Sequence, residues 1–196
     1  MKKIFIFVPI FLIALIIISS VSPVISKSED ISNNVFRLHI IANSDTEKDQ
    51  TLKLKIRDNV LRLTSELYNN CNSVDDAVSV TKENIVLFRQ AAQSIIAFYG
   101  YTYDTKVTVT KEYFNTRKYD NFTLPAGVYD SLKIIIGEGK GKNWWCVMFP
   151  SVCISGCTDD LRETLTEEEI EMLKSDKYIV RFKIVEIYEK LKSKIA

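Results

Sequence analysis

Residues 35–42, which read VFRLHIIA, alternate between two kinds of side chain. The even-numbered residues are apolar and point to one side of an extended chain, whereas Arg37 and His39 point to the other. Successive side chains of a β-strand face opposite sides of the sheet. The pattern therefore predicts a first strand with one apolar face and one polar face.

Two helices are expected directly after this strand. The first is predicted over residues 44–68, where Ser44 and Glu47 form a capping box and apolar residues recur at steps of three or four. The second is predicted over residues 73–99, with the same apolar spacing, and Gly100 follows it as a C-terminal glycine. Both helices have one apolar face, so both are expected to pack on the sheet.

The rest of the chain adds strands and then helices. Segments rich in β-branched and aromatic residues predict strands over 106–114, 117–123, 128–136 and 143–149. Their short links favour antiparallel pairing. Thr166 and Glu169 form a further capping box, and an amphipathic helix is expected near residues 180–191. The sequence therefore predicts an α+β fold, a mainly antiparallel sheet with helices packed on one face.

The N-terminus has the pattern of an export signal. Two lysines precede an apolar run, and no further charge occurs before Lys27. The run is also long enough to span a bilayer if it is not removed. We expect residues 1–26 to be a signal peptide or an uncleaved anchor that contacts the membrane through residues 4–25. Residues 27–196 are then a single exported domain.

Composition excludes several classes of protein. The chain of 196 residues has 26 basic and 25 acidic residues, which argues against a nucleic-acid partner bound through phosphates. His39 is the only histidine, so a His-rich metal site is excluded. The acidic run 167–169 is interpreted as the start of a helix. No metal or cofactor is expected.

Four cysteines lie in the exported part, where oxidation is favoured. A bridge between Cys146 and Cys153 requires the chain to reverse at Pro150, which is a natural turn residue. Cys71 and Cys157 are candidates for a second bridge. Sequence alone leaves the connectivity open.

Catalytic patterns are scarce. No Gly-x-Ser-x-Gly elbow is present, and a nucleophile would have only His39 as its base. The glycine-rich segment 137–141 lacks the Gly-Lys-Ser/Thr ending of a phosphate loop and precedes a strand. We therefore expect a protein that is not an enzyme and has no small-molecule substrate. A hydrolase with paired carboxylates stays open, because the spacing of such a pair in sequence is arbitrary.

The two adjacent tryptophans lie in the strand predicted over 143–149, so their rings face opposite sides of the sheet. One can be buried against the helices. The other is either covered by residues 150–196 or exposed, and exposed tryptophan is common in binding hot spots.

Four segments of the sequence resemble the stage II sporulation protein R family. They are FRLHIIANSD at 36–45, LPAG at 124–127, GEGKGKNWWCVMFP at 137–150 and VRFKIVE at 180–186. Cys153 falls where the second cysteine of the family follows its turn, whereas Ser151 replaces a common proline. Cys71 and Cys157 are not part of the family pattern.

The resemblance implies a function. Members of the family are exported from the forespore into the intermembrane space, either free or held by an anchor. There they activate a membrane-embedded aspartic protease of the mother cell, which cleaves the precursor of sigma-E. Such a protein is a ligand without catalytic residues. The competing interpretations are an exported enzyme that acts on the cell wall and a structural envelope protein.

The resemblance supplies no contact residues, so the expected contact surface comes from the sequence pattern. It combines the polar face of the first strand, the corner after it and the lysine-rich loop, with one tryptophan: Arg37, His39, Asn43, Asp45, Lys140, Lys142 and Trp145. Asn43 and Asp45 have an alternative role as residues that cap and turn the chain.

Overall fold

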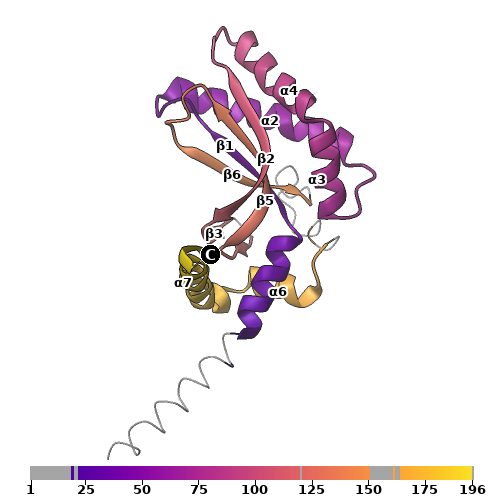
Figure 1. Ribbon diagram of the computed structural model, residues 1–196, viewed down its shortest axis with the longest axis vertical. Helices are drawn as coiled ribbons and strands as arrows, with labels where there is room; N and C mark the ends of the chain where they lie inside the picture. The colour runs from indigo at the N-terminus through magenta and orange to yellow at the C-terminus, as the bar shows by residue number, and fades with distance from the viewer. Residues whose placement is uncertain (1–18, 20–21, 120, 151–160, 162–163, 196) are drawn as a thin grey trace, which may run out of the picture.

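The computed structural model describes residues 19, 22–119, 121–150, 161 and 164–195 (Figure 1). A sheet of four strands forms its centre, in the order β2-β5-β1-β6. The bounds of these strands are Phe36–Ile41 for β1, Thr105–Phe114 for β2, Gly127–Ile136 for β5 and Asn143–Phe149 for β6. Each was expected within one residue or two of its observed ends.

The pairing within the sheet is mixed. Strand β2 pairs antiparallel with β5, and β1 pairs antiparallel with β6. The short link between β5 and β6 does not pair these two strands, because β1 lies between them. Strands β1 and β5 are parallel, which the sequence did not indicate. Parallel neighbours need a long crossover, and the helices together with β2 provide it. The short strand expected over 117–123 is a two-residue ladder between β3 (Arg117–Lys118) and β4 (Thr123–Leu124).

Three helices cover one face of the sheet: α2 (Glu47–Leu67), α3 (Val74–Glu83) and α4 (Ile85–Phe98). The single helix expected over 73–99 is therefore wrong, since Asn84 separates α3 from α4. The side chain of Asn84 donates a hydrogen bond to the carbonyl of Val80, 2.9 Å away, and such local bonds compete with a continuous helix.

The cap of α2 also differs from the expected one. Thr46, not Ser44, is the N-cap, and its hydroxyl accepts a hydrogen bond from the backbone N–H of Asp49. The capping box of Thr166 and Glu169 is confirmed at the start of α6.

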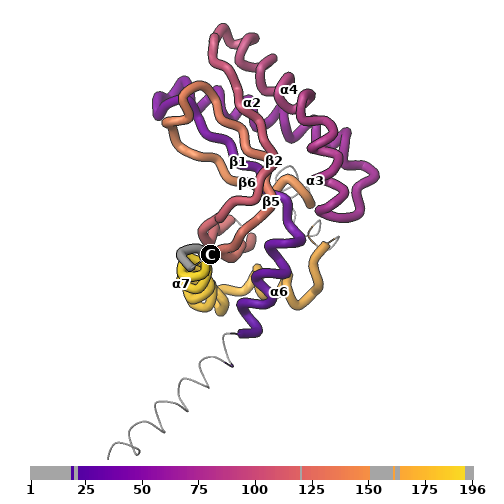
Figure 2. Tube along the Cα trace, viewed as in Figure 1, coloured from indigo at the N-terminus to yellow at the C-terminus, as the bar shows by residue number. Residues whose placement is uncertain are grey.

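The C-terminal helices lie against one end of the opposite face (Figures 1 and 2). They are α6 (Glu167–Lys174), the 3-10 turn η2 (Asp176–Tyr178) and α7 (Ile179–Ile195). A helical segment at residues 22–33 joins them. Together they form a second core with Phe114, Tyr129 and Val147 of the sheet. The α+β fold is thus confirmed, with a second group of helices at one end.

The helical segment 22–33 contains the expected boundary between residues 26 and 27. Val24 and Ile31 are buried on either side of it, 5% and 0% exposed. Lys27 forms an ion pair with Glu168 of α6. The apolar run at residues 1–18 lies outside the described residues, and among the described helices none is long and apolar enough to span a membrane. Cleavage or retention of the N-terminal segment stays a prediction.

Candidate functional site

The glycine-rich loop 137–142 is held against the corner that follows β1, which consists of residues 42–45. The side-chain oxygen of Asn43 accepts a hydrogen bond from the backbone N–H of Glu138 at 3.0 Å. A carboxylate oxygen of Asp45 accepts another from the N–H of Lys142 at 2.7 Å. Backbone bonds from residues 140 and 141 to the carbonyls of residues 43 and 42 complete the attachment. Asn43 and Asp45 thus shape the loop.

A buried network below the corner fixes it to α2. Asp49 accepts hydrogen bonds from Asn43 and Ser44 at 2.9 and 2.6 Å. Burial favours the neutral acid, but these bonds and one from Tyr103 outweigh it and lower the pKa of Asp49. Lys53, which is 4% exposed, donates a hydrogen bond of 3.0 Å to the carbonyl of Lys142. Hydrogen bonds from the corner after β1 and from Lys53 of α2 therefore hold the loop backbone.

Two glycines of the loop are required by geometry. A Cβ atom on Gly141 would lie 2.2 Å from the carbonyl oxygen of Ser44, which is a severe clash with backbone. Gly137 has a φ of +53°, and a Cβ there would lie 2.3 Å from the side-chain oxygen of Asn43. The glycines thus permit a close approach between the loop and the corner after β1.

The charged ends of the loop point into solvent. The side chain of Lys140 is 75% exposed and pairs with Glu138 at 2.8 Å. Lys142 is exposed as well, although its backbone N–H and C=O are both bonded. The loop therefore presents two lysine side chains on a fixed backbone.

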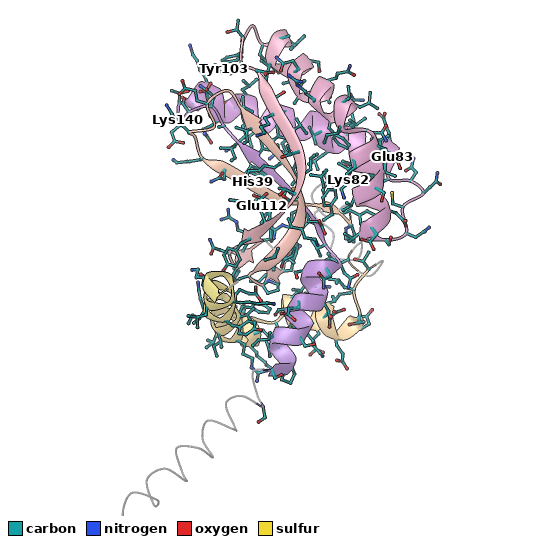
Figure 3. All side chains as sticks on the ribbon, viewed as in Figure 1. His39, Lys82, Glu83, Tyr103, Glu112 and Lys140 are labelled. Carbon is teal, nitrogen blue, oxygen red and sulfur yellow. The ribbon has the colours of Figure 1, made fainter. Side chains whose placement is uncertain are left out.

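A polar cluster lies beside this loop on the sheet face opposite α2. The Nδ1 atom of His39 lies 3.0 Å from a carboxylate oxygen of Glu112, and Nε2 lies 2.8 Å from the side-chain oxygen of Asn143. The His39 ring stacks on Trp145, with 3.6 Å between ring centroids. Figure 3 shows His39 and Glu112 side by side at the middle of the sheet. His39 is only 4% exposed, so this ring positions Trp145 rather than meeting solvent.

Glu112 is the centre of the cluster. Its carboxylate also accepts hydrogen bonds from the Ser131 hydroxyl at 2.5 Å and the Lys133 ammonium at 2.9 Å. Burial alone would raise the pKa of Glu112, but the bonds from His39, Ser131 and Lys133 outweigh it and lower this pKa to about 2. Glu112 is thus a stable carboxylate that ties β1, β2 and β5 together.

Arg37 is fully buried, with 0% exposure. Its Nε atom donates to the carbonyl of Cys146 at 3.2 Å, and Nη2 donates to the Tyr119 hydroxyl at 2.6 Å. The guanidinium lies 4.3 Å from the ring centroid of Phe114, a cation–π distance. We therefore leave Arg37 out of the contact surface proposed below.

The tryptophans divide between the two faces as expected. Trp145 lies with His39, whereas Trp144 lies on the helix side, where the guanidinium of Arg57 is 4.5 Å from its ring. Both rings are half-buried.

The polar cluster is not arranged as a nucleophile and its base. Ser131 is fully buried, and its hydroxyl donates to Glu112 instead of to His39. Within the described part of the chain, no three His, Cys, Asp or Glu side chains gather as metal ligands. The exposed loop and the largely buried cluster are connected through Asn143, which follows the loop and contacts His39.

Sequence reasoning missed Glu112, Ser131 and Lys133. Part of their signal was present, because Ser131 and Lys133 are two residues apart in one predicted strand and so share a face, and Glu112 lies in another predicted strand. The missing information was the pairing of strands, which brings β2 and β5 next to β1.

The cysteines are only partly described. Cys146 is buried in β6, and Cys71 has a free thiol. Cys153 and Cys157 lie outside the described residues, so the bridge between Cys146 and Cys153 stays a prediction.

Comparisons with known proteins agree on one family. A sequence model of that family, stage II sporulation protein R, matches residues 32–159, which include β1, the loop and the polar cluster. Stage II sporulation protein R of Bacillus subtilis (strain 168) is 35% identical over 131 residues, covering 65% of this chain and 58% of that protein. No solved structure matches the chain. These sequence matches lead to one conclusion: the chain belongs to the stage II sporulation protein R family.

Proposed function

We propose that this sporulation protein is an exported signal that activates a membrane-embedded aspartic protease of the mother cell. That protease would then cleave the precursor of sigma-E. The family match over residues 32–159 carries the proposal, because it spans the fixed loop and the polar cluster. In this account the protein acts by contact alone, from the space between the two membranes.

The contact surface proposed here is the loop 137–142 with the exposed edge of Trp145. Hydrogen bonds hold the backbone of Lys140 and Lys142 in place before binding, which lowers the entropy cost of ordering the loop on recognition. Two exposed ammonium groups suit an acidic segment of the protease. His39, Asn43 and Asp45 contribute by positioning Trp145 and the loop.

Activation requires preferential binding. A ligand shifts a two-state protein only as far as it binds one state more tightly than the other. The protease would therefore present its acidic segment in a complementary arrangement only in the active form. A ligand that favours a dimer of the protease would meet this condition.

The test replaces both lysines, K140A with K142A, and measures cleavage of the sigma-E precursor during sporulation. Both side chains are exposed, so the variant is expected to fold normally and to lose at least tenfold in cleavage rate. Lys82→Ala is the matched control, because Lys82 is a lysine on α3, away from the loop (Figure 3). Normal cleavage by the folded double variant would remove the loop from the interface.

One observation favours the enzyme alternative. A cavity between residues 22–33, β5 and α7 is lined by Glu29 and Glu189, and burial raises the pKa of Glu189. A raised pKa suits a general acid. However, Lys192 bonds Glu29 at 2.8 Å and lies 3.9 Å from Glu189, so it bridges the two carboxylates. Glu189→Gln distinguishes the two functions in the same assay. Cleavage of the sigma-E precursor should continue if the protein is a ligand, and should be lost if it acts as a hydrolase through Glu189.

A further inference from the structure

Helix α7 has two apolar faces, and only one of them packs on the protein. Phe182 and Val185 are 0% and 1% exposed in the second core. The residues that predicted an amphipathic helix from sequence lie on the solvent side. They are Val180, Ile184, Ile187 and Leu191, which are 71%, 39%, 61% and 56% exposed. Their steps of four, three and four place them on one stripe along the helix.

Basic side chains border this stripe on both sides. At 100° per residue, Lys183 and Lys190 follow one edge of the stripe, and Arg181 and Lys192 follow the other. The side chains of these three lysines are 54–67% exposed. An apolar stripe with a cationic border is therefore the outer surface of α7.

The acidic residues of α7 are turned inward. The side chains of Glu186 and Glu189 are only 13% and 8% exposed. Glu186 pairs with Lys183 at 3.1 Å and with Lys190 at 2.7 Å. The lysine side chains are long and exposed, so their ammonium groups can turn toward an external anion without moving the helix backbone.

We propose that α7 lies flat on an anionic lipid surface, with its stripe inserted among the acyl chains and its basic border at the phosphates. An exposed apolar stripe between rows of Lys and Arg is the sequence pattern of an interfacial helix. A symmetric second copy is disfavoured, because two such helices would face each other with like-charged borders. The occupant is therefore a membrane rather than another molecule of this chain.

The position of α7 in the fold supports this placement. The helical segment 22–33 lies in the same core, and Glu29 of that segment bonds Lys192 at 2.8 Å. In sequence, an uncharged apolar run from residue 4 to residue 18 leads into this segment. Helix α7 lies outside residues 32–159, which the family model matches, and is separate from the loop 137–142, so the proposal is independent of the protease contact.

The experiment uses the full chain in vesicles, with an environment-sensitive fluorescent amino acid in place of Ile187. Vesicles of phosphatidylglycerol with phosphatidylcholine are compared with phosphatidylcholine alone. We expect a blue shift in the anionic vesicles that high salt weakens. The same probe in place of Phe98 is the control, since Phe98 is 80% exposed at the end of α4, a helix that lies away from α7 (Figure 1). It should not shift.

A second variant tests the charge directly. Arg181→Gln with Lys183→Gln removes two basic side chains that would lie near the anionic surface, which weakens the electrostatic attraction to it. We expect the ratio of membrane-bound to free α7 to fall about tenfold or more. If the fluorescence of the Ile187 probe does not change with phosphatidylglycerol, the proposal is overturned. A blue shift without vesicles that grows with protein concentration would also overturn it, and would indicate a second copy.

Discussion

Glu112 shows how a single carboxylate organises the polar face of the sheet. It bonds His39 of β1 and both Ser131 and Lys133 of β5. Because His39 stacks on Trp145, the position of that tryptophan depends on a carboxylate in another strand. The surface is thus set by contacts that a reading of β1 alone does not contain.

Replacing this carboxylate should alter the pH dependence of stability. The pKa of Glu112 is about 2 in the fold and near 4.5 in the unfolded chain, so its charge stabilises the fold above pH 4.5. That contribution, about 3 kcal/mol, is lost as the pH falls from 4.5 to 2. Glu112→Gln should therefore be less stable than the natural protein at pH 7, and the two should converge near pH 2.

Urea unfolding across this pH range measures the difference. Glu83→Gln is the matched control, since Glu83 is exposed on α3 and should change stability little at any pH. An equal difference between Glu112→Gln and the natural protein at pH 7 and pH 2 would contradict the assigned role.

At the level of elements, the loop 137–142 and the corner after β1 act as one unit. Gly141 allows the loop backbone to approach the carbonyl oxygen of Ser44, where a Cβ atom would lie 2.2 Å away. Gly141→Ala should therefore displace the loop and destabilise the protein by about 1–3 kcal/mol. Lys140→Ala is the control, because it removes only an exposed side chain.

Chemical denaturation gives the stability of both variants, and amide exchange at Lys142 reports the bond to Asp45 directly. Loss of protection in Gly141→Ala, with retention in Lys140→Ala, is the expected result. Unchanged protection in Gly141→Ala would show that the loop does not depend on this close approach.

The sequence predicted individual elements better than their connections. Alternation located β1, and a composition rich in β-branched and aromatic residues located β5 and β6. Neither pattern could indicate that β1 and β5 are parallel, since neither carries information on pairing partners. The apolar spacing of residues 73–99 also predicted α3 and α4 as one helix, because this spacing continues across Asn84. The side-chain hydrogen bond of Asn84 to Val80, which competes with a continuous helix, is not visible in that spacing.

The candidate site was predicted only in part, for a related reason. Lys140 is exposed in the loop and Trp145 is half-buried beside His39, whereas Arg37 lies on the same face as His39 but is covered by Tyr119 and Phe114. Strand alternation distinguishes the two faces, but it does not show which side chains from other strands and loops cover part of a face.

At the scale of the whole molecule, the two faces of the sheet have different tasks. Helices α2, α3 and α4 cover one face, and the main core lies between them and the sheet. The other face carries the polar cluster at its middle and the second core at one end. This division leaves the loop at one end of the molecule and α7 near the other (Figure 1).

The central claim is that the protein acts by contact after export. Its most direct test uses sporulating cells that lack the gene and produce the chain in the forespore. One form is natural, and the other has Leu12→Arg and Ile16→Arg, which interrupt the uncharged export segment. Both forms are quantified by immunoblot, together with the precursor of sigma-E. We predict cleavage of the precursor with the natural form only, although the retained form accumulates. Normal cleavage with a chain that stays inside the forespore would contradict the account.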